Sequence, residues 1–167
     1  MDILLLLSAL CLMGFVSCSV KKFGLLKSYS AYASKWSLMI AQQPVWSVVT
    51  FLSAMLLIPP MIEVGADNPL QCCGFFAPVY LIVVSLTPNW QKDKMQHKVH
   101  VFGAAICAAF ALAWLILICH LWHIVLSVTI LILALAIIIK RYDAYVFWGE
   151  MILFISVYLS LILQSWT

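Results

Sequence analysis

Six apolar runs, each close to the length of a membrane-crossing helix, make up most of this chain of 167 residues. A bilayer core about 30 Å thick needs about 20 apolar residues of helix, so a run of that length with few charges predicts a span. Some of the six runs are at the short end of this range. They cover residues 3–20, 44–64, 70–86, 99–121, 123–139 and 144–163. The sequence therefore predicts an all-α, polytopic integral membrane protein with a single transmembrane domain of six helices.

The composition excludes the other broad classes of protein. Hydrophobic residues make up 66% of the chain and charged residues 9%, against about 45–50% and about 25% in an ordinary globular domain. So few charges are insufficient to cover the surface of a soluble fold. A β-barrel is excluded because the runs are continuously apolar, whereas barrel strands alternate between lipid-facing and lumen-facing residues.

The positive charges indicate the topology. All nine lysine and arginine residues follow the first, third or fifth run: Lys21, Lys22, Lys27, Lys35, Lys92, Lys94, Lys98, Lys140 and Arg141. The end of the second run and the loop after it hold only Glu63 and Asp67, and the loop after the fourth run holds no charge. Because cytoplasmic loops are enriched in lysine and arginine, we expect the odd-numbered loops inside and both termini outside.

The first run differs from a signal peptide in the order of its charges. Signal peptides carry positive charge before their apolar stretch. Here Asp2 precedes the stretch, and Lys21 and Lys22 follow it. We therefore expect a retained anchor of reversed orientation.

The connection 21–43 has a helical pattern of its own. Apolar and aromatic residues recur in it at three- and four-residue spacing: Leu25, Tyr29, Tyr32, Trp36 and Met39. Lys27 and Lys35 lie off this stripe. The pattern predicts a cytoplasmic interfacial helix, with its aromatic side toward lipid and its lysines toward anionic headgroups. An ordered linker that covers the bundle is the alternative. Since lipid explains the lysines, we expect no nucleic-acid partner.

Two adjacent prolines, Pro59 and Pro60, interrupt the second run. Residues 44–58 would form about 22 Å of helix, which is too short to cross a bilayer. The helix should therefore continue past a break at which the carbonyls of residues 55 and 56 lose their amide partners. Such breaks form ion and substrate sites in transporters, but they also occur as simple kinks.

Small residues recur every four positions in the fourth run, at Gly103, Cys107 and Ala111. Small side chains at this spacing let helix backbones approach closely. We therefore expect this helix to be central, and the uniformly aliphatic fifth run to face lipid.

Glu150 is the one carboxylate inside an apolar run and away from its ends, since Glu63 lies at the very end of the second run. A charge there costs at least about 2.5 kcal/mol, which makes an intramembrane acid a candidate functional group. His100, in the first turn of the fourth run, is its best partner because both lie toward the cytoplasmic side. A Glu–His contact would relay protons or bind a polar headgroup, or it would be a structural hydrogen bond that joins two helices.

His97 lies one turn before His100 and extends this candidate site. A zinc site needs three or four converging ligands, and His97, His100 and Glu150 would be just enough for one. That arrangement would make the protein a membrane-embedded lipid hydrolase. We instead expect no metal and no cofactor, with these three residues as a polar binding centre.

Two short motifs resemble known membrane families. They are Ser28-Tyr29-Ser30-x-Tyr32 after the first run and His100-x-x-Gly103-Ala104 at the start of the fourth. With six short helices, the chain resembles DRAM-like and related uncharacterised small membrane proteins. The resemblance implies membrane residence more than a defined activity. In that family the segment after the first helix is thought to face outward, whereas the lysines here place it inside.

The sequence as a whole favours a non-enzymatic multi-pass protein that binds or passes a small solute, an ion or a lipid. The alternatives are the metal-dependent lipid hydrolase and a structural anchor for a cytoplasmic partner that docks on 21–43. We expect membrane lipids and further copies of the chain as partners. Compact loops and the absence of an Asn-x-Ser/Thr site favour the inner membrane of a bacterium.

Overall fold

The computed structural model describes residues 2–39 and 45–165, and these form an all-helical protein. The long helices are α1 (Asp2–Phe23), α3 (Val45–Val64), α4 (Cys72–Ser85), α5 (Lys94–Ala113), α6 (Trp122–Ile138) and α7 (Tyr145–Gln164). The shorter elements are η1 (Tyr29–Ala31), α2 (Tyr32–Met39), η2 (Trp114–Ile118) and η3 (Tyr142–Ala144).

Each apolar run of the sequence corresponds to one long helix. The second run was predicted to begin at Pro44, which lies outside the described residues. The largest difference is at the fourth run, where the helix begins at Lys94 and not at residue 99. Asp93 explains the earlier start, because its carboxylate accepts hydrogen bonds from the amides of Met95 (2.7 Å) and Gln96 (3.0 Å) and so caps the helix.

Four helices in the described part of the chain are long and apolar enough to cross a membrane. They are Ile3–Phe23, Val45–Val64, Lys94–Ile118 and Tyr145–Gln164. Helices α4 and α6 have 14 and 17 residues, or about 21 and about 26 Å at 1.5 Å per residue. The structure thus supports an integral membrane protein with at least four candidate spans.

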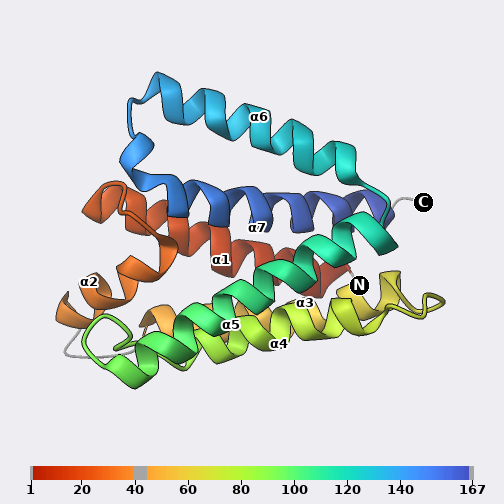
Figure 1. Cartoon of the computed structure of the whole chain (residues 1–167), viewed down its shortest axis with the longest axis horizontal. Coiled ribbons are helices and arrows are strands. Elements are labelled where there is room, and N and C mark those ends of the chain that lie inside the picture. The colour runs from red at the N-terminus through yellow and green to blue at the C-terminus, as the bar shows by residue number, and fades with distance from the viewer. Residues whose placement is uncertain (1, 40–44, 166–167) are drawn as a thin grey trace.

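The long helices form an up-and-down bundle, and the two ends of the chain lie toward the same end of it (Figure 1). Consecutive helices α3, α4 and α5 pack side by side, and α1 packs against α3. Helix α7 contacts α1, α3, α5 and α6. It is the most buried of the four candidate spans and α5 is the least, so the central helix is the last one and not the fourth. Helix α6 lies outermost (Figure 1), with an exposed aliphatic surface, as its composition predicts.

The small residues of α5 serve local packing against α4. Gly103, Cys107 and Ala111 are buried on one face. A Cβ atom at Gly103 would lie 3.3 Å from a side-chain carbon of Val84 on α4. The stripe therefore permits close contact between α4 and α5, as its spacing predicts.

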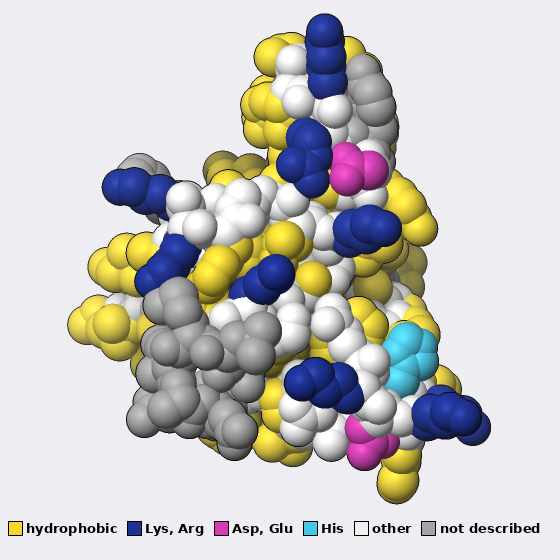
Figure 2. Space-filling view, turned by 90° about the vertical axis from the view of Figure 1, so that its left-hand side faces the viewer, with side chains coloured by type: hydrophobic (Ala, Val, Ile, Leu, Met, Phe, Trp, Pro, Cys, Tyr) yellow, Lys and Arg dark blue, Asp and Glu magenta, His cyan; other side chains and the backbone are white. Residues whose placement is uncertain are grey.

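The end of the bundle opposite the termini carries the positive charge, and we call it the cationic face. It consists of Lys21, Lys22, Lys27, Lys35, Lys92, Lys94, Lys98, Lys140 and Arg141. Figure 2 views the molecule from this end and shows lysine and arginine side chains distributed across it. The eight lysines are exposed. Among the described residues the only ion pair joins Arg141 to Asp143, at 3.0 Å.

Over residues 21–39 the single interfacial helix expected for 21–43 is replaced by several short elements, and residues 40–43 lie outside the described residues. Helix α1 continues to Phe23 and ends at Gly24, whose φ of +72° and N–H bond to the Val20 carbonyl (2.9 Å) form a left-handed cap. An irregular segment then leads into η1 and α2. The exposed fractions of Tyr29 and Tyr32 are 2% and 0%, so this part of the aromatic stripe packs into the protein and not into lipid. The alternative of an ordered, covering linker describes the segment better.

The prolines do not break the second long helix. Helix α3 is continuous from Val45 to Val64 with Pro59 and Pro60 inside it. The irregular turn occurs instead at η2, a π-helical turn in which the Cys119 amide bonds back to the Trp114 carbonyl (3.1 Å). This turn carries the fully buried Trp114, whose indole N–H donates to the Met61 carbonyl (3.1 Å).

Gly74 provides a test of this packing. An added Cβ would lie 2.7 Å from the Met61 carbonyl oxygen and 3.0 Å from the Trp114 ring. We expect Gly74→Ala to destabilise the protein by about 1–3 kcal/mol, because overpacking forces backbone atoms apart. Thermal unfolding in detergent should therefore show a lower Tm.

Gly149→Ala is the matched control, since a Cβ at Gly149 in α7 meets no atom within 4 Å. Alanine is the better helix former by about 0.5–1 kcal/mol, so this variant should keep or raise the Tm. Equal Tm values for the two variants would contradict the close α3–α4–η2 contact.

Candidate functional site

Residues 24–31, which we call the strap, follow α1 at the cationic face and are held to the bundle by Glu150 and His100. The Tyr29 amide donates to Glu150 Oε2 on α7, at 2.6 Å. The Ser30 hydroxyl lies 2.9 Å from His100 Nε2 on α5. Neighbouring residues of the strap thus bind Glu150 on one side and His100 on the other.

Helix α7 holds the strap at two points. The amide of Phe147, in the first turn of α7, donates to the Lys27 carbonyl (3.0 Å). One turn later, Glu150 accepts the Tyr29 amide. A helix N-terminus leaves amides without intrahelical partners, and here one of them pairs with a strap carbonyl. Glu150 therefore satisfies a backbone donor in a low-dielectric region, where a donor without a partner is costly.

Further hydrogen bonds satisfy other backbone groups of the strap. The Tyr32 hydroxyl donates to the Gly24 carbonyl (2.8 Å), and Arg141 Nη2 donates to the Leu25 carbonyl (2.7 Å). Arg141 also hydrogen-bonds Asp143, which lowers the pKa of that exposed carboxyl. The strap is thus fixed by side chains from several elements and has no regular structure of its own before η1.

His100 has a partner on each ring nitrogen and is 4% exposed. Nδ1 lies 2.8 Å from Thr87 Oγ1, and the Thr87 hydroxyl lies 2.7 Å from the Val84 carbonyl. Thr87 has one proton, which the carbonyl accepts. A neutral imidazole can donate a hydrogen bond from Nδ1 to Thr87 and accept one from the Ser30 hydroxyl at Nε2. This tautomer satisfies every group in the series of hydrogen bonds.

Tryptophan rings enclose His100. Trp90 stacks on the imidazole with 4.6 Å between ring centroids and 9° between planes, and Trp46 lies 6.1 Å away. Trp90 also stacks on the exposed His97, at 5.7 Å, and its indole N–H donates to the Ser30 carbonyl (3.3 Å). Trp90 therefore binds the strap and covers the histidine that holds it.

Tyr29 inserts its side chain from the strap into the bundle core. Its hydroxyl lies 2.7 Å from Thr50 Oγ1, and Thr50 in turn donates to the Trp46 carbonyl (2.7 Å). Its ring packs edge-on against Phe15 and Phe154. Burial raises the pKa of the Tyr29 phenol, so the phenol stays protonated and donates to Thr50.

The structure therefore brings Glu150 and His100 to one segment without joining them to each other. Within the described residues each is bonded to the strap instead. His97 lies beside them on Trp90. Pro59 and Pro60 lie near the opposite end of α3, far along the chain from the helix start at Val45.

The lysines and the tryptophan expected at the interface lie on the outside of this region. Lys27 and Lys35 are exposed. The partly buried Trp36 donates from its indole N–H to Ser19 (2.8 Å), and the Lys22 ammonium lies 5.2 Å from its ring centroid. The sequence argument did not identify Ser30, Thr87 or Trp90 as site residues. Single hydroxyls and loop tryptophans are common in membrane proteins, and the sequence contains no signal that singles out these three.

The same residues give no support to a metal site. Among the described residues, no group of three or more histidine, cysteine, aspartate and glutamate side chains is placed to hold an ion. The six cysteines are all free thiols.

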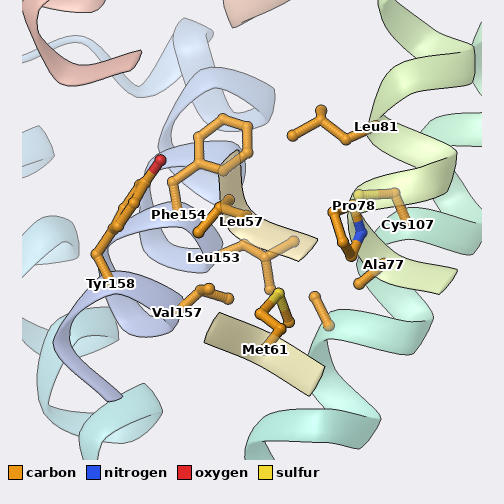
Figure 3. A pocket seen from close by; sticks show the side chains of 11 residues that line it. Leu57, Met61, Ala77, Pro78, Leu81, Cys107, Leu153, Phe154, Val157 and Tyr158 are labelled. Atoms are coloured by element: carbon orange, nitrogen blue, oxygen red, sulfur yellow. The ribbon is translucent and has the colours of Figure 1, made fainter. Parts of the chain in front are cut away.

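The bundle also encloses a small apolar cavity between α3, α4, α5 and α7, which Figure 3 shows from close by. Its volume is about 30 Å³, and its lining includes Leu57, Met61, Pro78, Cys107, Leu153 and Phe154. This is room for about one water molecule, and a cavity of this size with apolar walls stays dry. Tyr158 borders the cavity, but its hydroxyl hydrogen-bonds Ser8 (2.7 Å).

Comparison of the chain with protein-family models, curated proteins and solved structures gave no match.

The strap bond of Glu150 can be tested by proteolysis at Lys27. Replacing Glu150 by Ala removes the acceptor of the Tyr29 amide, and leaving such a donor unsatisfied costs about 1–3 kcal/mol. Because proteolysis tracks the open population, trypsin cleavage after Lys27 should accelerate about tenfold. Timed digestion followed by mass spectrometry gives the rate.

Glu150→Gln is the matched variant because its amide oxygen can still accept the bond. It should be cleaved at close to the wild-type rate, and cleavage after Lys92 should be equal in all three proteins. Wild-type cleavage at Lys27 in Glu150→Ala would show that the carboxylate does not hold the strap.

Proposed function

We propose that this chain is a non-enzymatic, six-helix membrane protein that binds anionic phospholipid headgroups at its cationic face. The observation that carries the proposal is the row of eight exposed lysines at one end of the bundle, none in an ion pair among the described residues. Lysines that protein carboxylates do not neutralise remain available to lipid phosphates. Each adds about 1 kcal/mol of attraction to an anionic membrane surface.

Six spans are proposed because α4 and α6 follow the direction of their longer neighbours. Helix α4 packs between α3 and α5, and α6 packs along α7. A short helix in such a position can be accommodated by local thinning of the bilayer. By the positive-inside rule the cationic face is cytoplasmic and both termini are external. We further propose the cytoplasmic membrane of a bacterium as the location, on the compactness of the loops.

Binding is favoured over passage because the cavity is apolar and has room for only about one water molecule. The polar groups Glu150 and His100 are hydrogen-bonded to the strap and do not line this cavity. The hydrolase alternative would need a third converging ligand, and the described residues offer none. The resemblance to DRAM-like families and the association of several copies remain predictions.

The topology is tested by cysteine labelling in a bacterial host. In a variant without the native cysteines, Asp67→Cys and Lys94→Cys place exposed thiols at opposite ends of the bundle. A membrane-impermeant maleimide should label Asp67→Cys in intact cells and Lys94→Cys only after permeabilisation. The reverse pattern, or equal labelling, would contradict the proposed orientation.

Lipid binding is tested by native mass spectrometry with phosphatidylglycerol and phosphatidylcholine. The wild-type protein should retain phosphatidylglycerol preferentially. Replacing Lys92, Lys94 and Lys98 by Gln should lower that retention at least about fivefold, which is less than the full sum of about 1 kcal/mol per lysine because salt screens exposed charges.

The control carries Glu63→Gln and Asp67→Asn at the opposite end, and it should retain phosphatidylglycerol like the wild type. A wild-type protein without preference between the two lipids would refute headgroup binding. The structural anchor for a cytoplasmic partner would then be the better hypothesis.

A further inference from the structure

We infer that a groove between α3 and α4 is the site of one anionic phospholipid, with its acyl chain and glycerol ester against the protein. This inference rests on the proposed function, because it locates the lipid that the cationic face would bind.

The groove has the size and surface of a ligand site. Its volume is about 370 Å³, within the range of about 300–1,000 Å³ that is usual for such sites. It is lined mainly by Ser47, Val48, Phe51 and Leu52 of α3 and by Ser85 and Leu86 at the end of α4. Both helices contribute to it, so the groove follows from how they pack.

The apolar walls of the groove face outward, toward the membrane. The exposed fractions of Val48, Leu52 and Leu86 are 51%, 45% and 67%. Acyl chains are the occupants that such walls select in a bilayer. Figure 1 shows that α3 begins and α4 ends toward the cationic face, so the groove lies at that end of the bundle. A lipid seated in it would have its phosphate level with the lysines, and charge complementarity therefore favours an anionic headgroup.

Ser47 gives an independent indication of a ligand. Its hydroxyl oxygen is buried and has no hydrogen-bond partner among the described residues. Other hydroxyls nearby bond back to their own helices: Thr50 to Trp46, Ser53 to Val49 and Ser85 to Ile82. Buried polar groups are normally paired. The ester carbonyl of a glycerolipid, an acceptor located at the depth where headgroup and chain meet, would supply the missing partner.

The experiment measures retention of phosphatidylglycerol on the full-length protein by native mass spectrometry at rising detergent concentration. Leu52→Trp fills the groove, and Leu131→Trp is its control because Leu131 is an equally apolar, 70% exposed position on α6. We expect Leu52→Trp to reduce the tightest-bound phosphatidylglycerol about tenfold by steric exclusion, and Leu131→Trp to match the wild type.

Ser47→Ala is a second variant that tests the groove without disturbing the fold, because it removes one oxygen and adds no bulk. Losing a hydrogen bond of about 1 kcal/mol should lower phosphatidylglycerol retention about fivefold. Retention equal to wild type in both Leu52→Trp and Ser47→Ala would overturn the groove assignment.

The two proposals fail in different ways. If the wild type prefers phosphatidylglycerol and the triple lysine variant loses it, headgroup binding stands even when the groove variants have no effect. If the groove variants lower phosphatidylcholine as much as phosphatidylglycerol, a lipid occupies the groove but the anionic assignment is overturned.

Discussion

The hydrogen bond between the Glu150 carboxylate and the Tyr29 amide is the interaction on which the cationic end of this molecule depends. A chain that turns back from α1 without regular structure exposes backbone donors and acceptors where little water is present. Each must find a partner within the protein. Glu150 and the amide of Phe147 provide partners from one helix. Glu150 therefore supplies the acceptor that the Tyr29 amide needs at this point of the bundle.

His100 completes the same arrangement from the other side and connects it to the surface. Its two ring nitrogens join the Ser30 hydroxyl to Thr87, and Trp90 covers it. Since Trp90 also stacks on exposed His97, an aromatic contact continues from the buried histidine to the face with the lysines. The polar interior and the charged exterior thus share one set of side chains. A headgroup bound near His97 would contact the residues that hold the strap.

The apolar runs predicted the helices well, because a span is a local property of about twenty consecutive residues. Lysine positions likewise predicted which loops share an end. The interior of the site was not predictable in the same way. Tyr29 and Glu150 are separated by 121 positions and Ser30 and His100 by 70, and one sequence contains no signal for such pairings. Tyr29 and Tyr32 of the stripe pack into the protein and not into lipid, a distinction that periodicity does not make because both surroundings are apolar. Helix α3 continues past its two prolines, as the length of the second run required.

The position of α7 in the chain has a consequence for how the protein is made. The strap is synthesised early, directly after the first helix, whereas Phe147 and Glu150 belong to the last helix. Until α7 enters the membrane, the Lys27 carbonyl and the Tyr29 amide lack their native partners. The first loop is thus completed only when the last helix arrives. A substitution in α7 that removes these partners would therefore disturb the strap, which follows the first helix.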